Sequence, residues 1–363
     1  MKKKQVRVLV VAGLANNTLD CYVSQIAKSE MVEVCVLRSR PGVARERVTY
    51  ICPPSMLRKS PLLSFLWKAL YSLRLGASKR ISCIYAIFAY PHLYLAYLIA
   101  YLTKKPLFYS IIAARYELVS RNPVLQTLTI KLARKASKII MSGEGVEKLL
   151  TEKGIQSKDL VKYSILELVN LEGFEPLKQD RPIDLIVVSR LVPDKHIDVF
   201  IDIVASLKES NPSIKAAVIG NGGLKKDLED YVNSLNLSDN IKFHGYVSSA
   251  NNINRILNSA KIFVLNSSHE GGPFTVPEAM AAGLCVISSN VGEVKNVIEH
   301  GQNGFVVERY NDVDNYVNII RMLLENPETL EKIQRRAAKI KNRGMNTSLG
   351  RFWERAVAKL HRS

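Results

Sequence analysis

The sequence lacks the cysteine patterns of a disulfide-stabilised or zinc-binding protein. Its 363 residues include only five cysteines, an odd number, and no two of them stand in a Cys-x-x-Cys pair. Scattered thiols in odd number predict neither a disulfide framework nor a zinc site, and they suit a reducing compartment. We therefore expect a cytoplasmic protein. The five thiols are Cys21, Cys35, Cys52, Cys83 and Cys285.

Motifs of nucleic-acid binding are also missing, although the chain carries a formal net charge of +18. The sequence contains no zinc-finger spacing, no RNP-like aromatic motif and no heptad zipper. Low-complexity tracts and short repeats are absent as well. We therefore expect no nucleic-acid partner.

Acidic residues are scarce in one part of the chain. Between Arg38 and Lys138 there are 18 basic residues and only two acids, Glu46 and Glu117. Residues 1–176 carry 27 Lys and Arg against 12 Asp and Glu, a net +15, whereas the remainder carries 24 against 21, a net +3. The N-terminal half should therefore present a positive field to an anionic partner.

Charge is missing altogether from the 23 residues between Arg80 and Lys104, unless His92 is protonated. A run of that length can cross a bilayer as one helix. Pro91, however, divides it into a strand-like part, Ile81–Phe88, and a helix-like part, Leu93–Leu102. We therefore expect a strand followed by a helix in place of a spanning segment.

Residues 58–70 combine basic flanks with an apolar middle. Arg58, Lys59 and Lys68 border a helical stretch that contains Phe65 and Trp67. The pattern is typical of a helix at a membrane interface, and also of a core-packed helix with solvated ends. The regional positive charge favours the first interpretation. It predicts contact with an anionic membrane surface and a peripheral position on the inner face of the plasma membrane.

Strand-like and helix-like segments alternate along the whole chain, which predicts α/β units with parallel sheets covered by helices. A polar stretch between Asn170 and Pro182 separates two such sets. We therefore expect two Rossmann-like domains, residues 1–175 and 176–345, and a final helix at 346–363 that packs back on the first domain. The expected strands are residues 6–11, 33–37, 81–88, 107–112 and 138–141, and then 185–188, 216–219, 241–243, 262–265, 285–287 and 304–307.

The segment 267–291, SSHEGGPFTVPEAMAAGLCVISSNV, holds two carboxylates eight residues apart, Glu270 and Glu278. Between them a Gly271-Gly272-Pro273 turn leads into a predicted helix that Gly283 ends. A helix start leaves backbone N–H groups unpaired and favours anions. The turn therefore predicts a phosphate site.

That phosphate site has hydroxyl acceptors on both sides. The free amides would be those of Phe274 and Thr275, with Glu270 before the turn and Glu278 one helical turn beyond it. Each carboxylate can accept hydrogen bonds from hydroxyl groups. A sugar nucleotide has this order of groups: a sugar, a diphosphate and a ribose.

Two cations five residues apart, Arg190 and Lys195, follow the first strand of the C-terminal half, where α/β sheets bind ligands. Arg can grip a phosphate with two hydrogen bonds, and Lys adds a point charge. Glycine turns follow two further strands, at Gly220-Asn221-Gly222 and at Gly245-Tyr246. The triplet Asp312-Val313-Asp314 reads as a helix-capping turn. We therefore expect the phosphate charge to be met without a metal ion.

Together these motifs resemble the signature of retaining glycosyltransferases of family 4, the glycosyl transferases group 1. The resemblance implies the GT-B fold, with the donor site in the cleft between two Rossmann-like domains. It also implies transfer of a hexose from a nucleotide-diphosphate sugar to a glycan or lipid-linked acceptor in surface polysaccharide synthesis. The expected donor is a UDP-sugar. The nucleotide sugar is a substrate, and no cofactor is implied. The base, the sugar and the acceptor are not identified.

The resemblance also assigns roles to residues of the C-terminal half. Glu270 would contact the donor sugar and Glu278 the ribose diol, while Arg190 and Lys195 would neutralise the diphosphate. The implied catalytic residues are Glu270, Arg190 and Lys195, and the implied donor-binding residues are Gly271, Gly272, Pro273, Phe274, Thr275, Glu278, Gly220, Asn221, Gly222 and Tyr246.

The sequence departs from the family pattern elsewhere. The His-Gly-x-Asp run expected after the fourth strand is replaced by Ser110–Arg115, and the Gly-Gly loop after the first strand by Gly13-Leu14-Ala15. His196 stands where the family commonly has Gly, and Val291-Gly292-Glu293 replaces a Gly-Gly pair followed by Glu. Family roles on the acceptor side therefore do not carry over. Two other functions stay open: an epimerase or hydrolase on the same fold, and a non-catalytic protein that binds a lipid or a partner.

Overall fold

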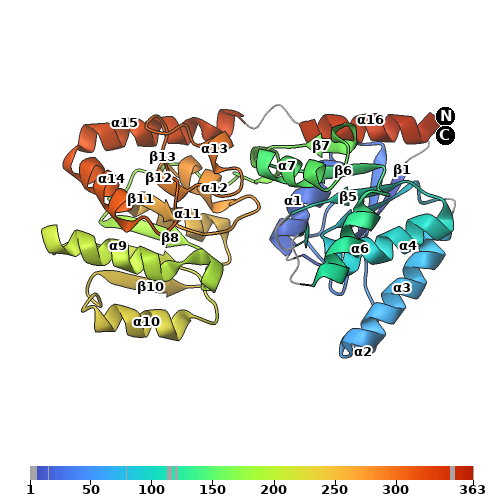
Figure 1. The fold of residues 1–363 in the computed structure, drawn as a ribbon, viewed down its shortest axis with the longest axis horizontal. Helices are drawn as coiled ribbons and strands as arrows, with labels where there is room; N and C mark the ends of the chain where they lie inside the picture. The colour runs from blue at the N-terminus through green and yellow to red at the C-terminus, as the bar shows by residue number, and fades with distance from the viewer. Residues whose placement is uncertain are drawn as a thin grey trace. The chain divides into compact units, whose positions relative to one another are not determined.

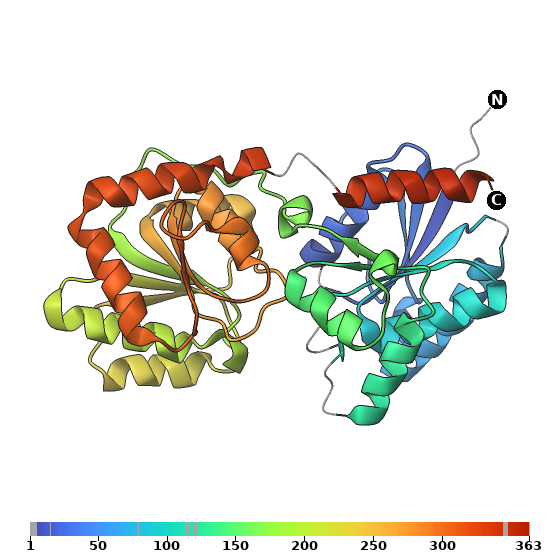
Figure 2. The same ribbon diagram turned by 45° about the horizontal axis from the view of Figure 1, so that its top comes forward.

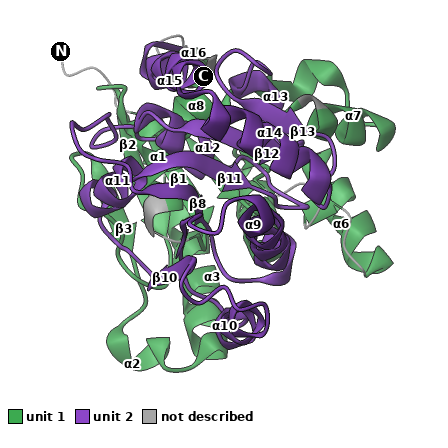
Figure 3. Ribbon diagram, turned by 90° about the vertical axis from the view of Figure 1, so that its left-hand side faces the viewer, with its two compact units in different colours: residues 1–168, 346–363 green, residues 169–345 purple. Residues whose placement is uncertain are grey.

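The computed structural model describes residues 6–14, 16–78, 80–112, 117–118, 122–343 and 348–362. The chain divides into two compact units, residues 1–168 with 346–363 and residues 169–345 (Figure 3). Each unit has its own parallel sheet and its own apolar core. The division after Leu168 lies close to the boundary predicted after residue 175.

The first unit contains a seven-stranded parallel sheet in the order β3-β2-β1-β4-β5-β6-β7. Figure 1 labels β1, β5, β6 and β7 of this sheet. Its strands are β1 (Val6–Ala12), β2 (Val32–Leu37), β3 (Val48–Ile51), β4 (Cys83–Ile87), β5 (Leu107–Ser110), β6 (Lys138–Met141) and β7 (Leu160–Lys162). Its helices are α1 (Asn16–Ala27), α2 (Ser55–Arg58), α3 (Pro61–Ala77), α4 (Tyr94–Thr103), α6 (Pro123–Ala133), α7 (Glu144–Glu152), α8 (Ile165–Leu168) and α16 (Ser348–Arg362).

The second unit contains a six-stranded parallel sheet in the order β10-β9-β8-β11-β12-β13. Its strands are β8 (Ile183–Val188), β9 (Ala216–Ile219), β10 (Ile241–Gly245), β11 (Ala260–Leu265), β12 (Cys285–Ser289) and β13 (Phe305–Val307). Its helices are α9 (Ile197–Ser210), α10 (Lys225–Ser234), α11 (Ala250–Asn258), α12 (Thr275–Ala281), α13 (Val294–Val297), α14 (Val313–Glu325) and α15 (Pro327–Ala337).

The central strands are buried along their whole length, which explains why they appear in the sequence as continuous apolar runs. In β11, Ile262, Phe263 and Val264 are fully buried, because helices cover both faces of the parallel sheet. All eleven strands predicted from such runs are present. The fold class predicted from the sequence, two parallel Rossmann-like sheets, is confirmed.

Two strands were not predicted, and both lie at edges of the first sheet. β3 pairs only with β2 and β7 only with β6 among the described strands, and the residues of both strands are half-buried or exposed. An edge strand has one neighbour and little burial, so it needs no continuous apolar run. The sequence therefore carried little signal for them.

The long uncharged run is split as predicted. Its first part forms β4 and its second part forms α4, which begins at Tyr94, two residues after His92. Among the described residues, no helix combines the length and the apolarity that crossing a membrane requires.

The C-terminal helix α16 runs beside the strands of the first unit (Figure 2) and completes its core by aromatic packing. The buried indole of Trp353 meets the rings of Tyr85 on β4 and Phe108 on β5 edge-on, with centroid distances of 5.1 and 5.5 Å. A segment far along the chain thereby covers the central strands of the first sheet. Such ring pairs add about 0.5–1.5 kcal/mol to the burial of their apolar surface.

We predict that Trp353→Ala lowers the free energy of unfolding of the first unit by about 3–5 kcal/mol, because it leaves a large cavity between α16 and the sheet. Urea denaturation followed by circular dichroism measures the change. Arg355→Ala, an exposed change on the same helix, is the control. A loss for Trp353→Ala no larger than that of the control would contradict this packing.

Candidate functional site

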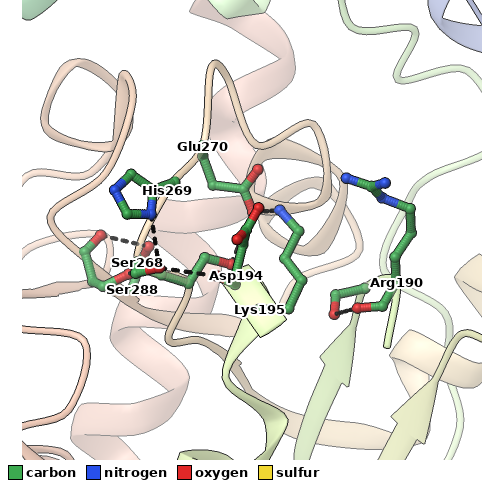
Figure 4. Close-up of polar contacts among 10 residues, drawn as sticks. Arg190, Asp194, Lys195, Ser268, His269, Glu270 and Ser288 are labelled. Atoms are coloured by element: carbon green, nitrogen blue, oxygen red, sulfur yellow. Dashed lines mark hydrogen bonds and ion pairs between the residues drawn. The ribbon is translucent and has the colours of Figure 1, made fainter. Parts of the chain in front are cut away.

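An ion pair between Lys195 and Glu270 lies at the centre of the candidate site, in the second unit (Figure 4). Lys195 ends a short 3₁₀ turn, Pro193–Lys195, that follows β8, and Glu270 lies in the loop after β11. The ammonium nitrogen is 2.5 Å from Glu270 Oε1, and the two side chains are only 10% and 15% exposed. The structure therefore brings together two residues that the sequence separates by 75 positions.

Further polar bonds hold these two loops together. Ser267 Oγ donates to Glu270 Oε1 at 2.9 Å, and the backbone N–H of Ser268 donates to the carbonyl oxygen of Asp194 at 3.0 Å. The hydroxyl of Ser268 also bonds His269 Nδ1 at 2.8 Å. The sequence did not predict that these serines and Asp194 belong to the site. Their role depends on contacts between neighbouring strand ends, and Ser267-Ser268 by itself is an ordinary loop sequence.

Arg190 lies on the same loop as Lys195 but is not joined to the ion pair (Figure 4). Its side chain is exposed, and within the described part of the chain its guanidinium group forms no hydrogen bond or ion pair. The Lys195 ammonium bonds Glu270 and has further N–H donors. Together with the free guanidinium of Arg190 it is suited to bind a multiply charged anion.

The predicted glycine turn after β9 holds the Arg190 loop by close backbone contact. A Cβ atom on Gly220 would overlap the carbonyl oxygen of Ser189, and one on Gly222 would overlap the backbone of Leu191. The Leu191 N–H donates to the carbonyl oxygen of Asn221 at 3.0 Å. Glycine is therefore needed at both positions so that two backbones can touch.

His196 adopts a left-handed backbone, with φ 46° and ψ 51°, immediately before α9. A side chain is strained in this conformation, whereas a glycine, which the family pattern predicts here, would not be. The imidazole compensates by stacking on Tyr310, with ring centroids 4.1 Å apart.

The Gly-Gly-Pro turn is followed directly by α12, as predicted, and Gly283 with φ 79° ends that helix. Gly292, with φ 55°, packs against the carbonyl oxygen of Gly271, and a Cβ would approach that oxygen to 2.8 Å. One glycine of the Val291-Gly292-Glu293 departure thus supports the turn. Within the described structure, the amides of Phe274 and Thr275 donate no hydrogen bond. The helix has only seven residues, so these amides act as local donors.

Glu278 lies in the first turn of α12, and burial raises the pKa of its carboxyl group to about 8. No hydrogen bond to the carboxyl group is present among the described residues. An uncompensated carboxyl group in an apolar site holds its proton. A ligand that donates hydroxyl hydrogen bonds would favour its ionised form.

Two concave sites adjoin these loops and differ in their number of carboxylates. One, of about 270 Å³, is lined by Ser267, Ser268, Glu308 and Arg309 among others. The other, of about 550 Å³, lies against α9 and α10 and is lined by Asp198, Asp202 and Asp227. Carboxylates repel phosphate, and the smaller site has one carboxylate beside one guanidinium where the larger has three carboxylates, so the smaller site suits an anionic ligand better.

Two other sequence predictions have different outcomes. Tyr246 follows β10 and is 72% exposed, so its ring is free to contact a base. Asp312 occupies the N-terminal cap position of α14, but its side chain forms no cap hydrogen bond and instead lies 3.5 Å from Arg309. The capping turn is present without the expected side-chain cap. Among the described residues, no three His, Cys, Asp or Glu side chains are grouped as metal ligands.

The run Ser110–Arg115 stands in place of the family's His-Gly-x-Asp run on the acceptor side. It is described only as far as Ile112, and residues 113–116 lie outside the described residues. The run Gly13-Leu14-Ala15 is described except for Ala15.

Comparison with known proteins finds, in the second unit, the same family that the sequence motifs resemble. Residues 171–340 match the family model of glycosyl transferases group 1. An uncharacterized glycosyltransferase of Haemophilus influenzae is 26% identical over 208 residues, which make up 57% of this chain and 57% of that protein. The UDP-Gal:alpha-D-GlcNAc-diphosphoundecaprenol alpha-1,3-galactosyltransferase of Escherichia coli is 31% identical over 137 residues, 37% of this chain and 34% of that one. The chain thus spans about half or less of the length of these relatives.

Solved structures extend the similarity of the fold to both units. HepE of Anabaena, in complex with UDP and glucose, has a TM-score of 0.77 at 17% identity and covers 99% of this chain and 100% of its own. The lipopolysaccharide outer core galactosyltransferase WaaB has a TM-score of 0.69 at 16% identity, over 98% of this chain and 99% of its own. Residues 171–340 thus match the glycosyl transferases group 1, and the fold of the whole chain is the GT-B fold of these solved structures.

Proposed function

We propose that this chain is a retaining glycosyltransferase that moves a hexose from a UDP-sugar to a glycan or lipid-linked acceptor in surface polysaccharide synthesis. The observation that carries the proposal is the buried Lys195–Glu270 pair beside the free guanidinium of Arg190. Two comparisons support the donor and acceptor classes. The E. coli relative is named for UDP-Gal and a diphosphoundecaprenol acceptor, and HepE binds UDP and glucose.

In this proposal Lys195 and Arg190 stabilise the departing diphosphate. Charge develops on the phosphate oxygens as the sugar leaves, and fixed cations stabilise that charge most in a site that excludes water. The Lys195 ammonium has three N–H donors. It can therefore bond a phosphate oxygen while it keeps its bond to Glu270.

Glu270 is held ready to orient the donor sugar. Its Oε1 atom accepts hydrogen bonds from both Lys195 and Ser267. Its Oε2 atom accepts none from the described residues, so it is the atom that would accept a bond from a sugar hydroxyl. A fixed carboxylate of this kind positions the anomeric carbon without forming a bond to it.

Retention of the anomeric configuration needs no protein base. The bond between the anomeric carbon and the phosphate oxygen breaks while the acceptor oxygen bonds on the same face. The acceptor hydroxyl proton passes to the departing phosphate oxygen, which acts as the base. The replacement of the family's His-Gly-x-Asp run is compatible with that mechanism.

An outward-facing apolar stripe on α3 supports peripheral membrane contact. Leu62, Leu66 and Leu70 lie four residues apart on one helix face and are 66%, 47% and 71% exposed. α3 packs against α4, whose Tyr101 and Leu102 are also exposed. In Figure 1, α3 leads away from the first sheet towards α2.

The charges around this stripe complement an anionic bilayer. Arg58 and Lys59 precede α3, Arg74 lies near its end, and Lys104 caps α4. Exposed leucines flanked by cations bind the headgroup boundary of membranes through combined apolar and electrostatic contact. This surface would bring the transferase to a lipid-linked acceptor.

We predict that Lys195→Met weakens UDP binding about 30- to 150-fold, because it removes a phosphate contact and leaves the Glu270 carboxylate unpaired in a buried site. Isothermal titration calorimetry measures the dissociation constant. The double variant Lys195→Met/Glu270→Gln should recover part of the loss. Lys226→Met, an exposed change on α10, is the control. Equal affinities for wild type and Lys195→Met would contradict the donor site.

The transfer itself is tested by release of UDP from UDP-sugars, with and without lipid-linked acceptor extracted from membranes. We expect acceptor to raise the release of UDP and a labelled sugar to appear in the lipid fraction. Release at an unchanged rate without acceptor would instead identify a hydrolase. No UDP release in either case, together with intact UDP binding, would identify a non-catalytic binding protein.

Glu278 should make donor binding depend on pH. Its carboxyl group is protonated below a pKa of about 8, and ribose hydroxyls bond the ionised form more strongly. UDP affinity should therefore rise about tenfold from roughly pH 7 to pH 9, a range in which phosphate is already ionised. Glu278→Gln should flatten this dependence. A wild-type affinity that stays constant over the range would show that the ribose does not contact Glu278.

The membrane surface is tested by flotation with vesicles that contain anionic phospholipid. Leu66→Ser should lower the partition coefficient about tenfold, since burial of a leucine side chain is worth about 1.5–3 kcal/mol. Val124→Ser, at an exposed position on α6 outside the stripe, is the control. High salt should weaken binding of all variants. A wild-type protein that remains unbound at low salt would contradict membrane contact.

A further inference from the structure

The first unit contains its own topological switch point, separate from the donor residues. In its sheet, β1 and β4 are neighbours, while the chain continues from β1 towards β2 and β3 and from β4 towards β5. Parallel α/β sheets bind ligands at the carboxyl ends of the strands where the order reverses in this way. The residues that follow β1, β2 and β4 are therefore the first place to look for a second ligand.

His92 occupies this switch point against Gly13. Gly13 follows β1 directly, and a Cβ atom there would overlap Nε2 and Cε1 of the imidazole. Nδ1 of the same ring is buried, and it has no hydrogen-bond partner among the described residues. Burial, and then Lys68, lower the pKa of His92 to about 4, so the ring is neutral at pH 7. A neutral imidazole can both donate and accept a hydrogen bond.

Arg38 follows β2 and is buried, and one of its two terminal NH₂ groups has no hydrogen-bond partner among the described residues. The residue is only 9% exposed. Nη2 donates to the carbonyl oxygen of Leu14 at 3.0 Å, but Nη1 is buried without a partner in the described part of the chain. A buried charge without compensation is costly, and proteins normally pair it with an opposite charge.

Lys68 on α3 is a second cation without a carboxylate. Its ammonium group donates to Ser39 Oγ at 3.1 Å, and burial lowers its pKa. Among the described residues, Lys68 and Arg38 each donate hydrogen bonds only to uncharged oxygen atoms. Asp20, an acid of the same region, forms two 2.5 Å hydrogen bonds with Arg45.

Contacts between neighbouring residues link these groups: Lys68 bonds Ser39, which follows Arg38, and Arg38 bonds Leu14, which follows the Gly13 that packs on His92. The thiol of Cys52 also lies near the cations. Cys52 follows β3, and burial raises its pKa. Arg58, Arg38 and Lys68 all act on it in the opposite direction. Three cations from different elements therefore act on the same end of the sheet. Their combined charge matches a phosphate or diphosphate better than a single carboxylate.

We propose that Arg38, Lys68 and His92 form a binding site for a phosphate group of the acceptor. Arg38 offers its free guanidinium edge, Lys68 adds a point charge, and His92 hydrogen-bonds a phosphate oxygen or the adjoining hydroxyl. This assignment deepens the proposed transferase function and rests on it. The phosphate has two possible sources, the diphosphate that links a glycan to a lipid and the phosphate of a soluble sugar.

Binding of inorganic pyrophosphate to the full chain, measured by calorimetry in the presence of saturating UDP, tests the site without turnover. UDP occupies the donor site of the second unit, so the remaining pyrophosphate site is counted by itself. Arg38→Met and Lys68→Met should each weaken pyrophosphate about tenfold, and higher salt should weaken it further. Lys131→Met, an exposed change on α6, should have no effect.

The two phosphate sources are distinguished by repeating the measurement with farnesyl diphosphate in detergent micelles and with glucose 1-phosphate. Arg38→Met should weaken whichever ligand belongs to the site. Leu66→Ser should further weaken farnesyl diphosphate alone if the acceptor is lipid-linked. Arg38→Lys, which keeps the charge, should retain most of the affinity, and it serves as the second variant if Arg38→Met does not fold.

Two results would overturn the proposal. The first is pyrophosphate affinity that neither Arg38→Met nor Lys68→Met changes. The second is loss of pyrophosphate binding when UDP saturates the protein, with Arg38→Met weakening UDP instead, because the cations then serve the donor. A protein that binds pyrophosphate as expected but transfers no sugar would retain the anion site and reject the transferase function.

Discussion

Parallel pairing of every strand is the constraint on which the rest of this structure depends. In a parallel sheet all carboxyl ends lie at one edge, so loops distant in the sequence meet there. In the second unit this brings the loops after β8 and β11 together and joins Lys195 to Glu270. In the first unit it brings Gly13, Arg38 and His92 to neighbouring strand ends. The same topology thus forms both candidate sites.

Close backbone contact fixes the loops of the second unit before any ligand binds. Gly220 and Gly222 let the turn after β9 touch the Arg190 loop, and Gly292 lets the loop after β12 touch Gly271. A side chain at these positions would separate the loops. His196 shows the converse case, since its left-handed backbone carries a side chain that stacking on Tyr310 supports. A site held by backbone contacts keeps its cations in position and loses little entropy on binding.

The cations of the two units have different partners. Lys195 is paired with a carboxylate, so a ligand at that site shares an ammonium group that is already satisfied in part. Arg38 and Lys68 bond neutral oxygens, so an anion there would provide their first opposite charge among the described residues. The difference follows the charge distribution of the chain, in which the N-terminal half has few acids. A ligand of the site proposed in the first unit would therefore be selected mainly by its negative charge.

The sequence alone determined the α/β class, the strands with continuous apolar runs and the resemblance of the second unit to a family, because burial patterns and the motif around Glu270 and Glu278 are local. It did not predict β3 and β7, since edge strands need little burial. Nor did it predict the bond between Lys195 and Glu270, or that of Ser268 with Asp194, because strand order decides which loops meet. His92 appeared in the sequence only as a residue in an uncharged run, and Arg38 as one of many cations. Only the tertiary structure decided that both face the same strand ends, because burial and missing partners are properties of packing.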